Sequence, residues 1–391
     1  MRSLWVLMAT AFVDMMGFAI VFPLLPFYAT DLGASPQVIG VLISSFSVAQ
    51  LASAPLWGRV SDRYGRRPVL LIGLASAGVA FVVFGLAQSV WLLLLSRTVQ
   101  GLGGGTTGVV QAYIGDATDQ KQRARGLGWL SAATSAGVMI GPAIGSVAAH
   151  FGRAAPGFVA AALCFLNVLF AWKYLPESKV ATARPARSIR TAVWQVVRHP
   201  AAPQPRLIWI YAVGMGAFTS LSAVVALYLN FRFGITAKTI GYVFVYIGAL
   251  SVVMRALVLG PLVDRFGEAR VLRTGAIMLG TGMALYTLPG SLWLMALVIP
   301  FVPIGTALLF PSVTALSSHL SDAKELGQMM GVQQAFGGFA RVVAPLGATW
   351  LYQHLGPADP FLVAACVMLL VTMLAFRLPA APRPAQPAVV P

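Results

Sequence analysis

The chain has 391 residues, of which 58% are hydrophobic and only 10% are charged, with a formal net charge of +16. In a typical soluble domain about a quarter of the residues are charged. This composition therefore excludes a soluble globular protein and indicates an all-α membrane protein. The positive charge does not indicate a nucleic-acid partner, because the arginines cluster between apolar segments, where they set orientation in a bilayer.

Twelve apolar stretches follow in chain order, each near the roughly 20 residues that a helix needs to cross a bilayer. A Pro-, Ala- and Arg-rich segment divides them and predicts a linker, and the end of the chain predicts a short disordered tail. The expected domains are a six-helix half at 1–175, a cytoplasmic linker at 176–205 and a second six-helix half at 206–391. The predicted spans are 4–28, 37–58, 68–88, 91–114, 126–149 and 156–175, then 206–229, 238–260, 270–289, 291–315, 327–352 and 359–378.

The distribution of Lys and Arg predicts the orientation. Of the 27 basic residues, 21 fall in segments on the side of the N-terminus, and only Arg153, Arg232 and Lys238 fall in loops on the other side. Basic residues are retained on the cytoplasmic side. We therefore expect a multi-pass protein of the plasma (inner) membrane with both termini in the cytoplasm. We also expect the protein to be a monomer.

The two halves repeat each other. Gly58, Asp62, Arg63 and Gly65 reappear 202 residues later as glycine, aspartate, arginine and glycine, and Ile39–Gly40 recurs as Ile240–Gly241. Duplicated halves are the building plan of alternating-access transporters. The repeat therefore predicts two pseudo-symmetric six-helix halves that rock against each other.

Three motifs stand out along the chain. Residues 58–68 read GRVSDRYGRRP, residues 97–103 read RTVQGLG, and span 1 carries Asp14 followed by PLLP at 23–26. These motifs resemble those of the major facilitator superfamily, over essentially the whole chain, and most closely those of its twelve-helix drug:proton antiporters, the group of the tetracycline exporters. The tetracycline pattern also includes an acid in span 3, which residues 68–88 lack. The resemblance implies the fold and the transport class, and it does not extend to tetracycline as substrate.

Asp14 and Arg97 are the candidate proton-coupling residues. Asp14 lies ten residues into span 1, about 15 Å from its inner end and near the bilayer midplane. A low dielectric favours the neutral form of a carboxyl group, so such an acid can carry a proton. Arg97 lies about 6 Å higher in span 4. We expect Asp14 to alternate between an ion pair with Arg97 and a protonated state; the alternative is a permanent structural pair.

Two further polar residues are candidate substrate contacts. Arg341 lies fourteen residues into span 11 with no acid at its level in that half, and a buried guanidinium requires water, a cavity or an anionic ligand. Gln100, three residues after Arg97 in span 4, is the second candidate.

The remaining motif residues predict mechanical roles. In span 5, glycines recurring every four residues share one helix face and permit close helix contact, and Pro142 bends the helix. The resemblance implies that this array is the antiporter-motif gate between the halves. It also implies that the loop after span 2 is a conformational latch, in which Asp62 approaches the start of span 11 and Arg66 contacts Asp116. The gate residues are Gly128, Gly137, Gly141, Pro142 and Gly145, and the latch residues are Gly58, Asp62, Arg63, Arg66 and Asp116.

We expect a proton-coupled secondary transporter that exports a small drug-like or amphipathic organic molecule, with no enzymatic activity, metal or cofactor. The sequence has no phosphate loop of the Gly-x4-Gly-Lys-Ser/Thr type, so the energy source is an ion gradient. Its expected partners are a small-molecule substrate, protons and membrane lipid. The alternatives are a proton-coupled or facilitative uptake carrier for a metabolite, and a membrane sensor or scaffold without transport.

Overall fold

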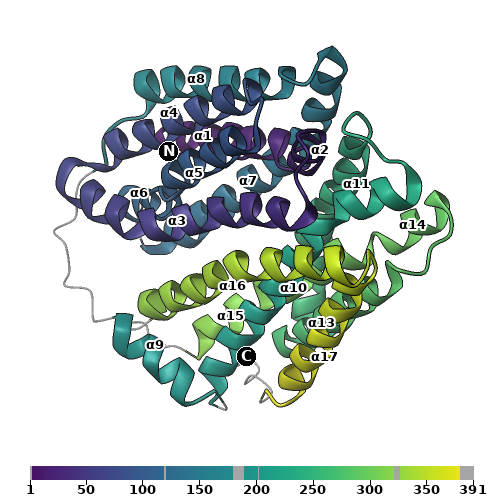
Figure 1. Ribbon diagram of the computed structural model, residues 1–391. Coiled ribbons are helices and arrows are strands. Elements are labelled where there is room, and N and C mark those ends of the chain that lie inside the picture. Colours follow the sequence, from purple (N-terminus) through teal and green to yellow (C-terminus); the bar gives the residue numbers. More distant parts are fainter. Residues whose placement is uncertain (1, 119, 179–188, 201, 321–325, 379–391) are drawn as a thin grey trace, which may run out of the picture. The chain divides into compact units, whose positions relative to one another are not determined.

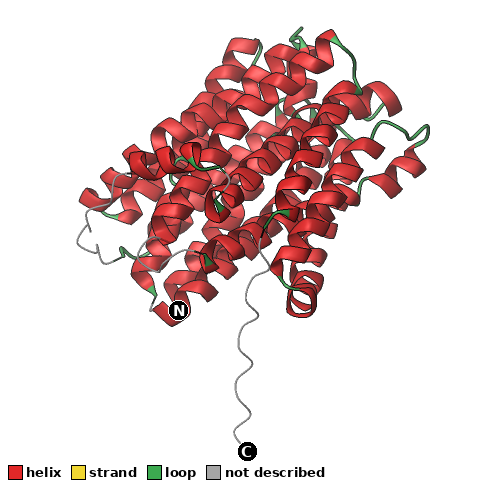
Figure 2. Ribbon diagram, turned by 90° about the horizontal axis from the view of Figure 1, so that it is seen from below, coloured by secondary structure: helices red, strands yellow, loops and turns green. Residues whose placement is uncertain are grey.

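The computed structural model describes residues 2–118, 120–178, 189–200, 202–320 and 326–378. These residues form helices and connecting turns, with no strand among them (Figure 2). Helices occupy all twelve predicted spans. Nine helical stretches in the described chain are long and apolar enough to cross a membrane. The tail expected after residue 378 and part of the predicted linker lie outside the described residues.

The first six spans contain eight α-helices, because spans 1 and 4 are each interrupted (Figure 1). Span 1 breaks at residues 22–24, which include the first proline of its PLLP motif, and span 4 breaks at its run of glycines. The helices are α1 (Arg2–Val21), α2 (Leu25–Asp31), α3 (Pro36–Tyr64), α4 (Arg66–Gly85), α5 (Val90–Gly104), α6 (Thr107–Ala117), α7 (Gln120–Ala148) and α8 (Ala155–Tyr174).

The linker contains a helix that the sequence analysis did not predict, α9 (Ile189–Arg198). Span 8 includes a π-helical stretch, η2 (Met254–Val258), and span 10 is interrupted at Pro300. The remaining helices are α10 (Pro203–Phe233), α11 (Ile240–Val253), α12 (Leu259–Phe266), α13 (Glu268–Leu285), α14 (Leu292–Val298), α15 (Phe301–His319), α16 (Leu326–His354) and α17 (Asp359–Phe376).

Equivalent turns in the two halves have the same backbone conformation. Ser89 accepts a hydrogen bond from Leu92 N at the start of α5, and Ser291, 202 residues later, accepts one from Leu294 N at the start of α14. Gly65 and Gly267, also 202 residues apart, both adopt a positive φ, of 99° and 79°, which favours glycine. The internal repeat therefore extends to local geometry.

The contacts divide the chain into two compact units. The first comprises Met1–Pro185, Thr219–Val252 and Arg341–Pro360, and the second comprises Ala186–Phe218, Val253–Ala340 and Phe361–Pro391. In the first unit α1 packs against α7 and α8, α4 packs against α5 and α8, and α3 packs against α5. In the second unit α13 packs against α15.

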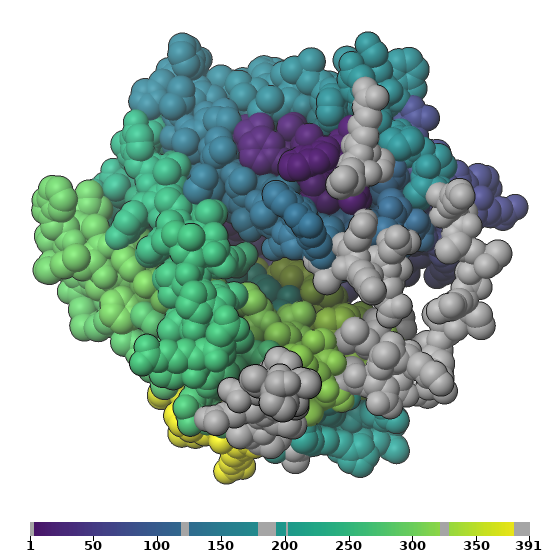
Figure 3. Space-filling view, turned by 180° about the vertical axis from the view of Figure 1, so that it is seen from behind, coloured from purple at the N-terminus to yellow at the C-terminus, as the bar shows by residue number. Residues whose placement is uncertain are grey.

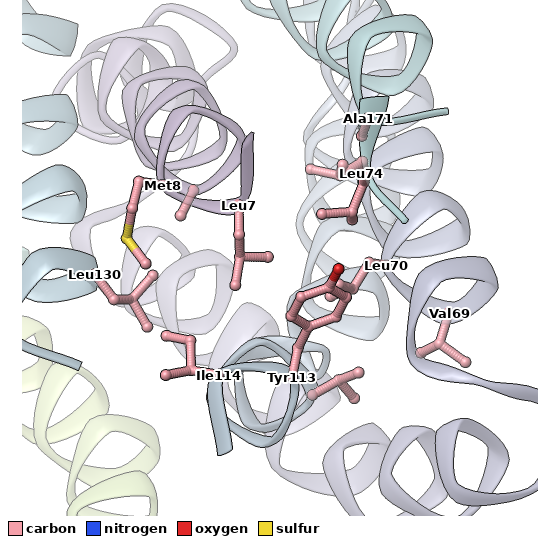
Figure 4. Packing of buried hydrophobic residues seen from close by; sticks show 12 residues of the cluster. Leu7, Met8, Val69, Leu70, Leu74, Tyr113, Ile114, Leu130 and Ala171 are labelled. Carbon is pink, nitrogen blue, oxygen red and sulfur yellow. The ribbon is translucent and has the colours of Figure 1, made fainter. Parts of the chain in front are cut away.

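The core of the first unit lies around the start of α1. Leu7, Leu70, Tyr113, Ile114 and Leu130 are buried there, from four helices, and their side chains point toward one another (Figure 4). Burying each large apolar side chain contributes on the order of 2 kcal/mol. The first turns of α1 reach the surface (Figure 3). This core fixes the position of α1 and hence of Asp14, two turns further along the helix.

Candidate functional site

Span 4 is interrupted where it faces Asp14. α5 ends at Gly104 and α6 begins at Thr107. Side chains satisfy the carbonyl groups that the break frees: Gln50 Nε2 donates to Gly104 O at 3.1 Å, and Trp57 Nε1 donates to Leu102 O at 2.6 Å. Irregular backbone at membrane depth persists only where protein groups satisfy it or where it lines a cavity. The break therefore places polar backbone and side-chain groups inside the first unit.

Asp14 is partly exposed and lines two small cavities of the first unit, of about 60 and 40 Å³. Each is large enough for water molecules, since one water needs only about 15 Å³ of such volume. The lining residues come from spans 1 to 5. The polar ones are Thr10, Thr106, Thr107 and Thr134 in the larger cavity and Gln50, Gln100, Thr106 and Thr107 in the smaller one.

The expected ion pair between Asp14 and Arg97 is not formed in this structure; among the described residues, neither side chain has a carboxylate or cationic partner within 4.0 Å. Arg97 is 1% exposed, and its guanidinium lies over the Phe84 ring, 5.5 Å from the centroid. Arg97 Nε and Nη2 have no hydrogen-bond partner in the described chain. Arg97 is therefore a buried cation facing an aromatic ring.

Helix direction explains why the pair is absent. Side chains of a helix tilt toward its N-terminus. Spans 1 and 4 run in opposite directions, so the tilt carries the carboxylate of Asp14 and the guanidinium of Arg97 away from each other. The height difference of about 6 Å expected between the two backbones thus underestimates the separation of the charged groups.

The two candidate substrate contacts have different surroundings. Gln100 is 4% exposed, lines the smaller Asp14 cavity and has an Oε1 atom without a hydrogen-bond partner in the described chain. Arg341 is partly exposed. Gln100 therefore shares a cavity with Asp14, whereas Arg341 lies outside both cavities.

The loop after span 2 contains a compact ion cluster. Arg66 Nε donates to Asp116 Oδ2 at 3.1 Å, and Arg66 Nη1 contacts Asp62 Oδ1 at 2.6 Å and Ser61 Oγ at 2.6 Å. The contact between Arg66 and Asp116 is the one that the family resemblance implied. Arg63 lies instead over the Tyr64 ring, at 5.4 Å. A Cβ at Gly58, the first latch residue, would meet nothing within 4 Å in the described chain, so no close helix contact depends on this glycine here.

Glu177, directly after span 6, was not predicted as part of this cluster. Its Oε1 accepts from Arg66 N at 2.7 Å and from Arg67 N at 3.2 Å, at the N-terminus of α4. Free amide groups and the helix dipole favour a carboxylate at this position. Tyr113 Oη also donates to Pro176 O at 2.6 Å. The start of the linker is therefore attached to the latch residues.

Removal of the Arg66 charge tests the cluster. The Arg66 and Asp116 side chains are 9% and 11% exposed, so Arg66→Gln leaves a buried carboxylate without its cation. We expect a loss of about 3 kcal/mol in stability, measured as a lower melting temperature of purified protein. Arg63→Gln is the control, because an exposed cation over a ring contributes less than about 1 kcal/mol. Equal melting temperatures for the two variants would contradict this account.

The glycine face of α7 contacts α1 rather than the second half of the chain. A Cβ at Gly137 would overlap Phe12 O, one at Gly141 would lie 2.6 Å from Met16 O, and one at Gly145 would overlap Ile20 O. Gly128 has nothing within 4 Å. The resemblance implied a gate between halves, but four-residue spacing defines only a shared face and not the helix that it contacts.

A different face of α7 contacts α11. Ser146 Oγ accepts from Gly241 N at 2.8 Å and donates to Ala237 O at 3.0 Å, which caps the first turn of α11. A Cβ at Gly241 would overlap Pro142 O, and one at Gly248 would lie 2.9 Å from Met139 Cα. Sequence reasoning included Pro142 but missed Ser146, because a lone serine in an apolar helix carries no distinguishing signal.

Ser146→Ala tests this contact. The variant loses both hydrogen bonds of a side chain that is 3% exposed, at a cost of about 1–3 kcal/mol. We expect α7 and α11 to separate more often, measured as a faster reaction of a cysteine placed at Ile240, which is fully buried at the start of α11, with a membrane-impermeant maleimide. Ser45→Ala is the control, because within the described chain Ser45 Oγ donates to Leu42 O of its own helix and to no other helix. An unchanged reaction rate in Ser146→Ala would show that the contact does not hold the helices together.

A similar contact joins α3 to α16. Ser44 Oγ donates to Val342 O at 2.7 Å, and Gln37 N donates to Gln353 Oε1 at 3.0 Å. A Cβ at Gly40 would lie 3.1 Å from Pro345 O. Within the first unit, α3 therefore packs closely on α16 through its N-terminal half, as α7 does on α11 through its C-terminal half.

Membrane helices that enclose polar cavities beside a single carboxylate are features of secondary transporters. The profile of the Major Facilitator Superfamily matches residues 7–258 and 255–391. The chain therefore belongs to the Major Facilitator Superfamily. It is a multi-pass membrane transporter of small molecules and not an enzyme.

Several relatives have names that refer to drug resistance. The class G tetracycline resistance protein of Vibrio anguillarum is 29% identical over 354 residues, which cover 87% of this chain and 88% of the relative. The class C tetracycline resistance protein of Escherichia coli is 30% identical and covers 90% of both chains. Multidrug resistance protein 2 of Bacillus subtilis is 28% identical and covers 93% of this chain and 92% of the relative.

Solved structures share the fold at low sequence identity. The human organic anion transporter MFSD10 (TETRAN) matches with a TM-score of 0.72 at 23% sequence identity. The match covers 96% of this chain and 99% of the MFSD10 chain. The nucleoside transporter NupG has a TM-score of 0.79 at 12% identity and covers 95% of this chain and 99% of its own.

Proposed function

We propose that this transporter exports a small drug-like or amphipathic organic molecule in exchange for protons, by alternating access, with Asp14 as the proton carrier. The observation that carries the proposal is the position of Asp14, which lines two water-sized cavities at membrane depth and has no ion pair in the described chain. A carboxyl group in this setting is stable when it is protonated and can exchange its proton with cavity water.

The lining of the larger cavity supports access from the inner side. It includes Leu7, seven residues into the chain, and Leu130, near the start of span 5. With the N-terminus in the cytoplasm of a plasma membrane, as the basic residues predict, both lie toward the inner face. The contacts of α7 with α11 and of α3 with α16 then lie toward the outer face. We infer that Asp14, through this cavity of the first unit, exchanges its proton with the cytoplasm.

We assign Arg97 an electrostatic role in the exchange. Ionised Asp14 is stabilised by a nearby cation, whereas protonated Asp14 is not. The structure has no pair between them, an arrangement suited to the protonated state of Asp14. When the proton leaves, movement of the Arg97 side chain off the Phe84 ring would bring the cation toward the carboxylate. Gln100 and Arg341 are the proposed substrate contacts.

The names of the relatives support export over uptake. The test is the accumulation of ethidium, a fluorescent amphipathic cation, in cells that express the transporter, with tetracycline and a quinolone measured alongside. We expect lower ethidium accumulation than in cells with the empty vector, and a return to the vector level when a protonophore collapses the proton gradient. Higher ethidium accumulation on expression would favour an uptake carrier. Ethidium accumulation that stays below the vector level in the presence of the protonophore would exclude proton coupling.

A further inference from the structure

Helix α9 has two faces with different environments. Val196 is fully buried against Ile208 of α10 and Val332 of α16. Trp209 Nε1, in α10, also donates to Val196 O at 3.3 Å, at the C-terminal end of α9. These contacts attach α9 to the beginning of span 7, within the second unit (Figure 1).

The length of α10 places α9 at the depth of the lipid headgroups. α10 contains 31 residues, or about 46 Å at 1.5 Å per residue, whereas the hydrocarbon core is about 30 Å thick. The first turns of α10 therefore extend beyond the hydrocarbon. Ile208 and Trp209 are five and six residues from the start of α10, so the helix that packs against them lies at the membrane surface.

The other face of α9 combines an aromatic ring with a cation. Trp194 is 56% exposed and Val197 is 47% exposed, and the exposed Arg198 guanidinium lies 4.8 Å from the centroid of the Trp194 ring. Tryptophan favours the interfacial region of a bilayer. A guanidinium stacked on a ring keeps its N–H edges free for bidentate hydrogen bonds to a phosphate.

The surrounding sequence is strongly basic. Residues 176–206 contain Lys179, Arg184, Arg187, Arg190, Arg198 and Arg206, and their only acid is Glu177. The carboxylate of Glu177 accepts from backbone amides at the start of α4, so it belongs to a different cluster from the exposed face of α9. The described residues 189–200 and 202–206 contain no acid, and the electrostatic complement of this face is an anion.

We propose that the exposed face of α9, formed by Trp194, Val197 and Arg198, binds the anionic phospholipid headgroups of the leaflet on its own side of the membrane. Trp194 and Val197 enter the interfacial layer, and Arg198 binds the lipid phosphate. Each basic residue near an anionic surface strengthens binding about fivefold, and the effect falls with ionic strength. The proposal goes beyond the transport function and holds whether or not protons drive transport.

The experiment measures which lipids surround α9 in the full-length protein. Val197→Cys carries a fluorophore in a variant whose two native cysteines, Cys164 and Cys366, are replaced. The labelled protein is reconstituted in phosphatidylcholine vesicles with a trace of spin-labelled phosphatidylglycerol or of spin-labelled phosphatidylcholine. The ratio of the two quenching efficiencies reports local enrichment of the anionic lipid.

We expect spin-labelled phosphatidylglycerol to quench more strongly, Arg198→Gln to lower the ratio about fivefold, and 1 M salt to lower it similarly. Arg232→Gln, which removes a basic residue at the far end of α10, leaves the ratio unchanged. Equal quenching by both lipids would overturn the proposal. Quenching by aqueous iodide but by neither lipid would also overturn it, because the face would then contact water or another protein.

Discussion

We expect replacement of Asp14 with asparagine to abolish the substrate gradient that the transporter sustains. One proton moving through 100 mV supplies about 2.3 kcal/mol, which maintains a roughly 50-fold gradient of a neutral substrate. The Asp14→Asn carboxamide has a similar shape but binds no proton, so we expect this gradient to fall to unity in energised vesicles. Ethidium exchange across vesicles without a proton gradient is expected to continue, because the variant leaves the helices and the substrate contacts in place.

Asp31→Asn is the matched control for this variant. Asp31 ends α2, is exposed, and lies outside both Asp14 cavities, so its removal leaves the gradient at the wild-type value. A wild-type gradient in Asp14→Asn would assign the proton to another group. Loss of both the gradient and the exchange would indicate a structural role for Asp14.

Gly137→Ala is expected to have the second large effect on transport, because the added methyl group displaces the backbone of α1 around Asp14. The new Cβ would overlap Phe12 O and lie 2.9 Å from Met16 N, on either side of Asp14 along the chain. Neither backbone atom can rotate away. Overpacking of this kind costs about 1–3 kcal/mol, and a displacement of about 1 Å at a reacting group reduces rates about 100-fold. We expect a lower melting temperature and a near-complete loss of proton-driven ethidium transport.

Gly128→Ala on the same helix is the control. Its Cβ would enter open space, and alanine favours helix over glycine by about 1 kcal/mol. Its stability and transport therefore stay at or above the wild-type level. If Gly137→Ala transported as well as Gly128→Ala, the close approach of α1 and α7 would have no role in coupling.

Hydropathy and residue spacing were sufficient to predict the membrane helices. All twelve predicted spans are helical, because only a helix satisfies its own backbone in lipid. The internal repeat was also visible, and it extends to the positive φ angles of Gly65 and Gly267. The ion pair of Arg66 with Asp116 followed from the family resemblance and not from spacing, since fifty residues separate the two.

Contacts that depend on the rotation of one helix against another were not predictable. Spacing placed Gly137, Gly141 and Gly145 on one face but could not indicate that this face contacts α1. Height along the spans placed Asp14 and Arg97 close together, because it compared backbone positions and left out the tilt of each side chain toward the N-terminus of its helix. The break in span 4 was hidden because residues 103–105 are glycines within an apolar run, and Gln50 and Trp57, which satisfy it, lie in another span.

The protonation of Asp14 itself is the most direct test of proton coupling. Infrared difference spectroscopy of the reconstituted protein detects the carbonyl stretch of a protonated carboxyl group, and Asp14→Asn identifies the band that belongs to Asp14. We expect this band in the wild-type protein near neutral pH, and we expect it to disappear when ethidium binds and the proton leaves. A carboxyl group that stays ionised throughout, or a band that ethidium does not change, would contradict the exchange of a proton for substrate at Asp14.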